Sequence, residues 1–204
     1  MIDFNAVEIY RLKDKKSPTN QNLLDLLRTW WLLRSKRIKA GKGVVFKKGT
    51  ALHICDTGSL EIGDHCFFHP NCQLILTLPK PRVEIGKWVF VGMHTIIASK
   101  NFIKIGDYTV IAPFCYFIDH EHGFSPDDII LNQRSILKET KVGRDCYFGT
   151  GSVVLGGVTV GDGAIIGAGS VVTQNIPPYE IWAGNPARRI KRRDQSGLDY
   201  PLQA

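Results

Sequence analysis

The sequence predicts an all-β fold in which short strands stack as the coils of a parallel β-helix. A six-residue period of aliphatic residues runs without a slip through residues 141–173, and glycine follows most of these residues. β-Branched residues dominate the run, which favours strands over helices. Six residues make one strand and one turn, so three such hexads would close one triangular coil. Successive coils would then stack as parallel strands about 4.8 Å apart.

The aliphatic residue of each hexad is expected to point into the coil, and the glycine after it to allow a close turn where a Cβ would clash. The same spacing of six extends upstream of the regular run. A glycine-rich sandwich is the alternative, but a sandwich has a period of two. The predicted inward residues are Ile62, Phe68, Leu74, Ile85, Val91, Ile97, Ile105, Ile111, Phe117, Val142, Phe148, Val154, Val160, Ile166 and Val172.

The repeat is interrupted in three places. The step from Leu74 to Ile85 is eleven residues, and the step from Ile97 to Ile105 is eight. The step from Phe117 to Val142 is twenty-five, which leaves nineteen residues beyond the normal six. A long loop inside a regular array is usually functional, so we expect the functional site here.

Three turns of the type Ile/Val-Gly-Asp and the ending Ala183-Gly184-Asn185-Pro186-Ala187-Arg188 carry a family resemblance. The turns are Ile62-Gly63-Asp64, Ile105-Gly106-Asp107 and Val160-Gly161-Asp162. With the hexads, they resemble the hexapeptide-repeat acyltransferases, and most of all the sugar O-acetyltransferases such as the galactoside and maltose enzymes. The resemblance covers residues 43–193. It implies a left-handed parallel β-helix, a homotrimer with active sites between subunits, and acetyl-CoA as the co-substrate.

The chain is expected to form one domain with extensions. We expect an N-terminal extension with a helix at 1–42, the β-helix at 43–187 with its long loop at 118–141, and a basic C-terminal tail at 188–204. No stretch of eighteen apolar residues occurs, so no spanning helix is expected. The N-terminus lacks an apolar signal core, which favours a cytoplasmic protein; the inner face of the membrane is the second location considered.

A helix is predicted to begin at Pro18, with Ser17 as N-cap, and to continue through the segment from Asn20 to Arg37. It is rich in leucine and tryptophan. We favour a helix that caps the open end of the coils and covers a strand edge. Its apolar residues spread too far round for a narrow amphipathic face, which indicates burial. The alternative is peripheral contact with a membrane through this helix.

Four of the five cysteines, Cys66, Cys72, Cys115 and Cys146, occupy the small-residue slot of the hexad, so we expect them to be buried as small apolar residues. No disulfide or metal site is expected, which fits a reducing cytoplasm. Zinc ligation by His65, His69 and His94 is an alternative, but solvated turn histidines fit their spacing better.

The net charge of +7 suits an anionic ligand. Five of the positive charges lie at Arg188, Arg189, Lys191, Arg192 and Arg193. No nucleic-acid partner is expected, because the basic run is short and no recognition module accompanies it.

The resemblance implies that His120, at the opening of the long loop, is catalytic. A histidine can accept the proton of an attacking hydroxyl near neutral pH. His122 could exchange roles with it. Asp119 or Glu121 could orient the imidazole, and Glu121 and His122 could contact the acceptor. Tyr147 stands where the family commonly has tryptophan and would keep an aromatic wall.

Small residues on later coils would leave a groove for the pantetheine arm of coenzyme A: Gly149, Thr150, Gly167 and Ala168. The resemblance adds Thr173 and Arg188 as cofactor contacts. Arg188 and Lys191 would hold the phosphates. The resemblance therefore implies an acetyl-CoA-dependent O-acetyltransferase that acts on a sugar hydroxyl, and we expect a role in surface polysaccharide biosynthesis. The alternatives are an acetyltransferase for a small amine, an antibiotic or serine, and a non-catalytic scaffold.

Overall fold

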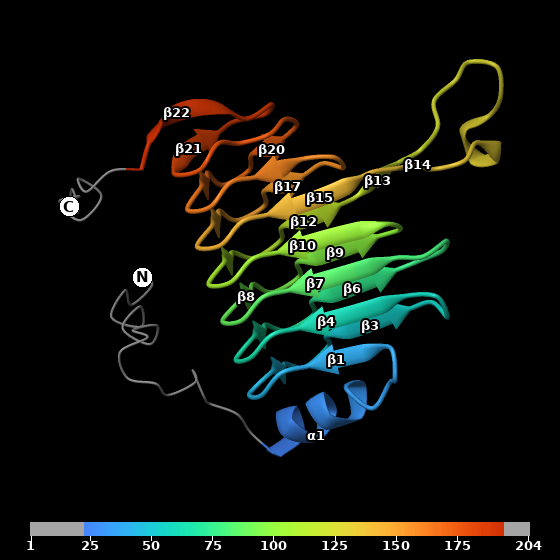
Figure 1. The fold of residues 1–204 in the computed structure, drawn as a ribbon, viewed down its shortest axis with the longest axis vertical. Coiled ribbons are helices and arrows are strands. Elements are labelled where there is room, and N and C mark those ends of the chain that lie inside the picture. The colour runs from blue at the N-terminus through green and yellow to red at the C-terminus, as the bar shows by residue number, and fades with distance from the viewer. Residues whose placement is uncertain (1–22, 194–204) are drawn as a thin grey trace.

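The computed structural model describes residues 23–193. One helix, α1 (Leu23–Leu32), lies at one end of a stack of coils whose strands form three parallel sheets, one on each side of a triangular prism (Figure 1). A two-stranded arm projects from the stack between two coils. The predicted fold, a left-handed parallel β-helix with an N-terminal helix and a long inserted loop, is confirmed.

Each coil contributes one strand to each sheet in turn, and all neighbours within the stack pair in parallel except at its C-terminal end. Sheet A contains β1 (Ile38–Ala40), β4 (Ser59–Ile62), β7 (Arg82–Ile85), β10 (Phe102–Ile105), β15 (Glu139–Val142) and β18 (Thr159–Val160). Sheet B contains β2 (Val45–Phe46), β5 (Phe67–Phe68), β8 (Phe90–Val91), β11 (Val110–Ile111), β16 (Tyr147–Phe148), β19 (Ile165–Ile166), β21 (Glu180–Ala183) and β22 (Arg188–Arg192). Sheet C contains β3 (Ala51–Ile54), β6 (Gln73–Leu76), β9 (Ile96–Ser99), β12 (Tyr116–Ile118), β17 (Val153–Val154) and β20 (Val171–Val172). The arm contains β13 (His120–Glu121), the short 3₁₀ helix η3 (Ile130–Asn132) and β14 (Ile136–Leu137).

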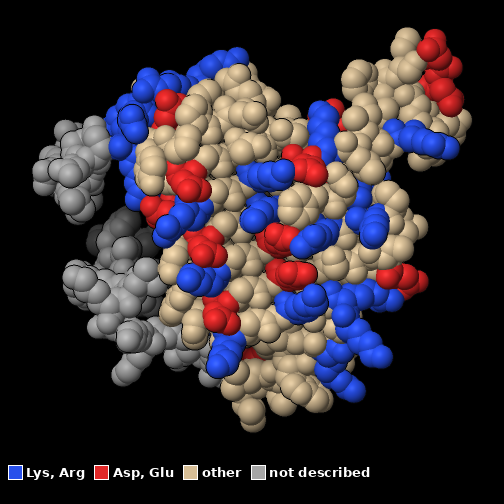
Figure 2. All heavy atoms as spheres, in the orientation of Figure 1, with Lys and Arg blue, Asp and Glu red and all other residues tan. Residues whose placement is uncertain are grey.

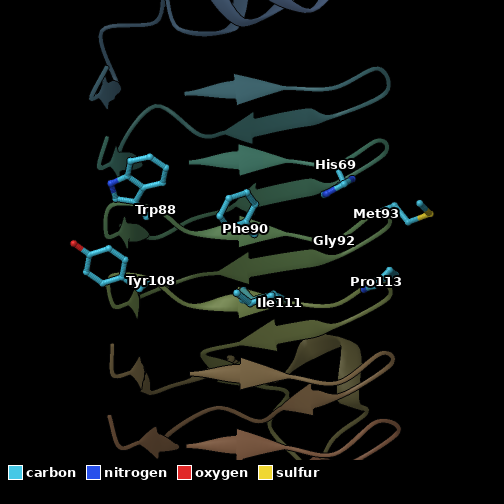
Figure 3. A pocket seen from close by; sticks show the side chains of 9 residues that line it. His69, Trp88, Phe90, Gly92, Met93, Tyr108, Ile111 and Pro113 are labelled. Carbon is cyan, nitrogen blue, oxygen red and sulfur yellow. The ribbon is translucent and has the colours of Figure 1, made fainter. Parts of the chain in front are cut away.

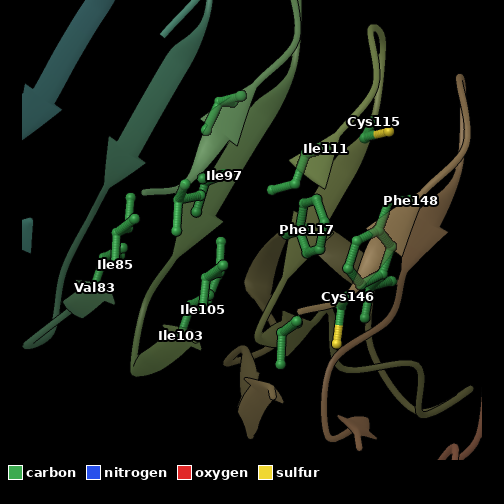
Figure 4. Packing of buried hydrophobic residues seen from close by; sticks show 14 of the residues in the cluster. Val83, Ile85, Ile97, Ile103, Ile105, Ile111, Cys115, Phe117, Cys146 and Phe148 are labelled. Carbon is green, nitrogen blue, oxygen red and sulfur yellow. The ribbon is translucent and has the colours of Figure 1, made fainter. Parts of the chain in front are cut away.

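The core is a column of like residues inside the prism (Figure 4). All fifteen predicted inward residues are buried. Register explains the stacking, because Ile85 pairs with Ile62 on one side and with Ile105 on the other. The long steps in the sequence are therefore absorbed at the corners, and the core keeps one register throughout.

The aspartates of the Ile/Val-Gly-Asp turns join successive coils. The carboxylate of Asp64 accepts a hydrogen bond from the backbone N–H of Lys42 at 2.7 Å, and that of Asp162 accepts one from Arg144 at 2.9 Å. The glycine before each donor permits this close approach. A Cβ on Gly41 would lie 2.7 Å from the backbone nitrogen of Asp64 in the next coil.

The four cysteines in the small-residue slot are buried and free, as predicted. Their thiols donate to backbone carbonyls of the next coil, for example Cys66 to Gly86 at 2.9 Å and Cys72 to Gly92 at 3.1 Å. Burial raises the pKa of Cys66 and of Cys72 to about 12. These thiols therefore fill space and satisfy corner carbonyls, and they remain protonated at neutral pH.

The N-terminal part differs from the prediction in detail. Helix α1 ends at Leu32, and Ser17 and Pro18 lie outside the described residues. The first coil begins at Ile38, and Phe46 stands in register with Phe68 as its inward residue. At the other end, Arg188–Arg192 of the predicted tail form β22, which pairs antiparallel with β21.

Helix α1 covers the end of the coils, as we favoured, but the expected burial of its apolar residues is wrong. Its buried residues are Asp25 and Thr29. The hydroxyl of Thr29 accepts the backbone N–H of Phe46 at 3.0 Å, and Asp25 pairs with Lys47 at 2.7 Å. Polar groups face the coil because the terminal coil offers an open backbone N–H, which must be satisfied.

Candidate active site

The long loop forms a hairpin arm whose base lies at the corner between sheets C and A. Strands β13 and β14 pair antiparallel, with His120 opposite Leu137 and Glu121 opposite Ile136 (Figure 1). The predicted catalytic histidine therefore stands on a strand directly after sheet C, at the point where the arm leaves the coils.

Asp119, one residue before the arm, is a fully buried carboxylate with four donors around it. The Ser99 hydroxyl donates to it at 2.6 Å, and the backbone N–H groups of Lys100 and Asn101 donate at 2.8 and 3.0 Å. The fourth partner is Nδ1 of His120 at 3.0 Å. These donors supply two hydrogen bonds to each oxygen of the buried carboxylate.

The bond to Asp119 fixes the state of the His120 ring. An ionised carboxylate only accepts hydrogen bonds, so Nδ1 must carry the proton that it donates. Nε2 is then the free basic nitrogen. The His120 side chain is 13% exposed, so the ring is held by its surroundings but can still be reached.

The other polar residues of the loop have different places. Glu121 pairs with Lys138 across the base of the arm at 2.8 Å, whereas the hydrogen-bond partner of the imidazole is Asp119. His122 is exposed on the arm. The base is fastened further by the Lys138 N–H, which donates to the Asp119 carbonyl at 2.7 Å, and by Asn101, whose side chain donates to the Lys138 carbonyl at 2.8 Å.

Sequence reasoning missed Ser99, Lys100 and Asn101 as parts of this site. A signal was present, because the step from Ile97 to Ile105 is two residues longer than a hexad. The structure uses the extra length to fold residues 99–101 around the Asp119 carboxylate of the next coil.

The residues predicted to bind the cofactor gather mostly at a second corner, between sheets B and C. Gly149 and Thr150 follow β16, and Gly167 and Ala168 stand above them in the next coil, after β19. A Cβ on Gly149 would lie 2.4 Å from the backbone nitrogen of Ala168. Thr150, Gly149 and their neighbours thus form a stacked column of small residues.

Arg188 lies at the same end of the molecule, opposite Ala183, and it is exposed. Lys191 lies further along β22, opposite Ile181, and is exposed as well. The structure therefore places an exposed positive strand beside the column of small residues.

The two corners are not brought together within one chain. His120 follows β12 at the corner between sheets C and A, whereas Gly149 and Thr150 precede sheet C. The width of sheet C separates them. Thr173 follows β20 and lies at the His120 corner, and Tyr147 is exposed on the outer face of sheet B. The structure therefore does not bring all the predicted site residues together in one chain.

Sheet B also carries an apolar groove of about 430 Å³ on its outer face (Figure 3). Trp88 and Tyr108 lie toward one end of this groove, and His69, Met93 and Pro113 lie toward the other. Phe90, Gly92, Val110 and Ile111 complete the lining. His120 is not among the lining residues, so the groove is separate from the His120–Asp119 pair.

The three histidines considered as zinc ligands are engaged with aromatic rings. His65 stacks on Trp88 with ring centres 4.4 Å apart, His94 stacks on Phe114 at 5.1 Å, and His69 packs edge-on against Phe67 at 4.9 Å. Burial, with a smaller effect of the Lys47 charge, lowers the pKa of His69 below 6.5. Within residues 23–193, no group of three or more His, Cys, Asp or Glu side chains could hold a metal ion.

Comparison with known proteins supports the fold and places the family. Residues 139–174 match the family described as bacterial transferase hexapeptide (six repeats). Over these residues the chain is similar to the hexapeptide-repeat transferases. The predicted family resemblance is thereby confirmed, and it covers the stretch in which the six-residue period is most regular.

Three relatives show which kinds of protein are similar to this chain in sequence. The chain is 31% identical over 177 residues to the probable acetyltransferase Rv3034c of Mycobacterium tuberculosis, covering 84% of this chain and 58% of the relative. It is 30% identical over 138 residues to a chloramphenicol acetyltransferase of Morganella morganii, and the match covers 64% of this chain and 59% of the relative. It is 28% identical over 145 residues to a galactoside O-acetyltransferase of Lactococcus lactis, covering 69% and 68%. The chain thus spans less than two thirds of the length of the first two.

A solved hexapeptide-repeat acetyltransferase of Vibrio cholerae, in complex with acetyl-CoA, has a TM-score of 0.62 to this structure at 22% identity. The match covers 86% of this chain and 81% of that one. At this identity the likeness establishes the fold.

No helix within the described residues is long and apolar enough to span a bilayer.

Proposed function

We propose that this hexapeptide-repeat transferase moves an acetyl group from acetyl-CoA to the hydroxyl of a sugar, with His120 as general base. The observation that carries the proposal is the His120–Asp119 pair at the base of the arm. A buried carboxylate holds Nδ1, and Nε2 is left as the base. The acetyltransferase names of the relatives support the reaction class.

The chemistry needs one basic group and no covalent enzyme intermediate. Nε2 of His120 takes the proton of the acceptor hydroxyl as its oxygen attacks the thioester carbonyl carbon. The imidazolium that forms is stabilised by the Asp119 carboxylate at 3.0 Å. When the carbon–sulfur bond breaks, the thiolate of coenzyme A receives the proton from Nε2. The products are the acetyl ester and free coenzyme A, and His120 returns to its neutral form.

Coenzyme A would lie along the corner between sheets B and C. The column of Gly149, Thr150, Gly167 and Ala168 carries no large side chain, which would suit the narrow pantetheine arm. The exposed guanidinium of Arg188 and the ammonium of Lys191 would bind the phosphates by charge-assisted hydrogen bonds.

A homotrimer would complete the site, because His120 and the cofactor corner lie on different edges of one prism. Two apolar surfaces would support such an assembly: the groove on sheet B and the arm, on which Phe124, Ile129 and Leu131 are exposed. By contrast, the outer face of sheet A carries charged side chains in pairs, such as Lys39 with Glu61 and Lys104 with Glu84.

A sugar acceptor is favoured by the galactoside O-acetyltransferase among the relatives. A role in surface polysaccharide biosynthesis is favoured by a relative named as a putative colanic acid biosynthesis acetyltransferase of Escherichia coli. An antibiotic acceptor is the second candidate, because a chloramphenicol acetyltransferase is equally similar. The buried free thiols fit a cytoplasmic location.

The experiment is an acceptor panel. Release of the coenzyme A thiol from acetyl-CoA is measured with monosaccharides, sugar nucleotides, chloramphenicol and serine, and the mass of the particle is measured by light scattering. The proposal predicts acceptor-dependent release with a hydroxyl-bearing sugar and the mass of a trimer. Release with chloramphenicol alone would assign the second candidate. If coenzyme A does not bind at all, the chain is a scaffold.

A further inference from the structure

Helix α1 presents its apolar side chains outward. The exposed fractions of six of the seven apolar side chains of the helix are 47–70%: Leu23, Leu24, Leu26, Leu27, Trp30 and Trp31. The polar residues Asp25 and Thr29 are buried against the first coil. This arrangement is the reverse of an ordinary surface helix, whose apolar face covers the core.

Specific contacts with the first coil set the orientation of helix α1. Thr29 satisfies the backbone N–H of Phe46, and Asp25 forms ion pairs with Lys47 at 2.7 Å and Arg28 at 3.2 Å. Turning the helix over would bury its apolar face but would leave these buried polar groups without partners, which is costly. The outward apolar face is therefore a fixed feature of this end of the molecule.

The surroundings of this face are basic, although Arg37 and Lys39 form ion pairs there with Asp56 and Glu61. Residues 23–48 contain eight lysines and arginines and a single acidic residue, Asp25. The Arg34 guanidinium lies 5.0 Å from the centre of the Trp30 ring, and Lys36 and Lys48 are exposed. Figure 2 shows Lys and Arg side chains beside the uncharged end of the molecule where Figure 1 places α1.

We propose that α1 docks this protein on the surface of an anionic lipid bilayer. Leucine side chains would enter the boundary between headgroups and acyl chains, where tryptophan is also favoured, and the surrounding basic residues would face the anionic headgroups. The basic residues around this face are electrostatically complementary to anionic lipid headgroups, and the bilayer also offers an apolar interior for the leucine side chains. The proposal goes beyond the transferase activity and does not depend on it.

The test is flotation of the full-length protein with lipid vesicles. Vesicles of phosphatidylcholine are compared with vesicles of an equal mixture of phosphatidylcholine and phosphatidylglycerol, at low and high salt. The variants are Leu27→Glu and Trp31→Glu, singly and together. The matched control is Leu78→Glu, which introduces the same charge at an exposed leucine on the loop between β6 and β7.

We expect the wild type and Leu78→Glu to float with the mixed vesicles, less so at high salt, and hardly with phosphatidylcholine alone. The double variant should bind at least about tenfold more weakly, because binding scales with the apolar area that the helix inserts. Its melting temperature and its particle mass in the absence of lipid should equal those of the wild type.

Several results would overturn the proposal. One is a wild-type protein that does not float with the mixed vesicles. Another is a double variant that floats as well as the wild type. A fall in melting temperature of the double variant without lipid would show that another part of the chain covers the face. A fall in its particle mass would show that a second copy does so. Vesicle binding is read without acetyl-CoA, so failure here leaves the transferase proposal standing.

Discussion

Replacing Asp119 by asparagine tests how the structure controls His120. Asp119 Oδ1 accepts from Lys100 N and His120 Nδ1, and Oδ2 accepts from Ser99 Oγ and Asn101 N. An amide nitrogen in either position points hydrogens at a backbone N–H, which loses its acceptor. One orphaned buried donor costs about 1–3 kcal/mol of folding free energy. In both orientations the negative charge that stabilises the imidazolium is lost.

We therefore expect Asp119→Asn to fold, to lose about 1–3 kcal/mol in denaturant unfolding, and to lower kcat by about a hundredfold or more. Thiol release at saturating acetyl-CoA gives kcat, and unfolding in urea gives stability. The control is Asp127→Asn, the same chemical change at an exposed residue of the arm. A variant that keeps kcat within about threefold of the wild type would refute the general-base assignment for an Asp119-held His120.

Three further predictions follow from other parts of the molecule. A maleimide should label Cys55 in the folded protein, whereas the four buried thiols should react only after unfolding, because burial raises the pKa of Cys66 to about 12; fast labelling of five thiols would contradict this, as read by mass spectrometry. Because the pKa of His69 is lowered in the folded protein, this histidine binds a proton more readily in the unfolded chain. The free energy of unfolding should therefore fall as the pH drops below 6.5, and its dependence on pH should be weaker in His69→Gln. Mixing His120→Ala and Arg188→Ala subunits at random should restore about a quarter of the sites if these residues meet between subunits; no recovery would place them in one chain.

The coils could be predicted because one physical rule repeats at every position. An inward aliphatic residue, a close turn and a small residue recur every six residues, so the burial of Phe148 or Ile166 is decided by local pattern alone. The cysteines were predictable for the same reason, since their slot recurs with the period.

The site could be predicted only in part. His120 was found because it opens the long loop, but the burial of Asp119 depends on Ser99 and Asn101, which belong to the previous coil. The separation of His120 from Gly149 follows from which sheet each strand joins. The orientation of helix α1 could not be predicted for a related reason. It depends on a backbone N–H of the first coil, that of Phe46, which donates a hydrogen bond to Thr29.

The central claim is that His120, and not its neighbour His122, is the base of the transfer. The most direct measurement is the kcat of thiol release for His120→Ala and His122→Ala, side by side, with the acceptor that the panel identifies. The account predicts a fall of at least about a hundredfold for His120→Ala and a change of less than about threefold for the exposed His122→Ala. The reverse order, or two variants that both remain active, would contradict it.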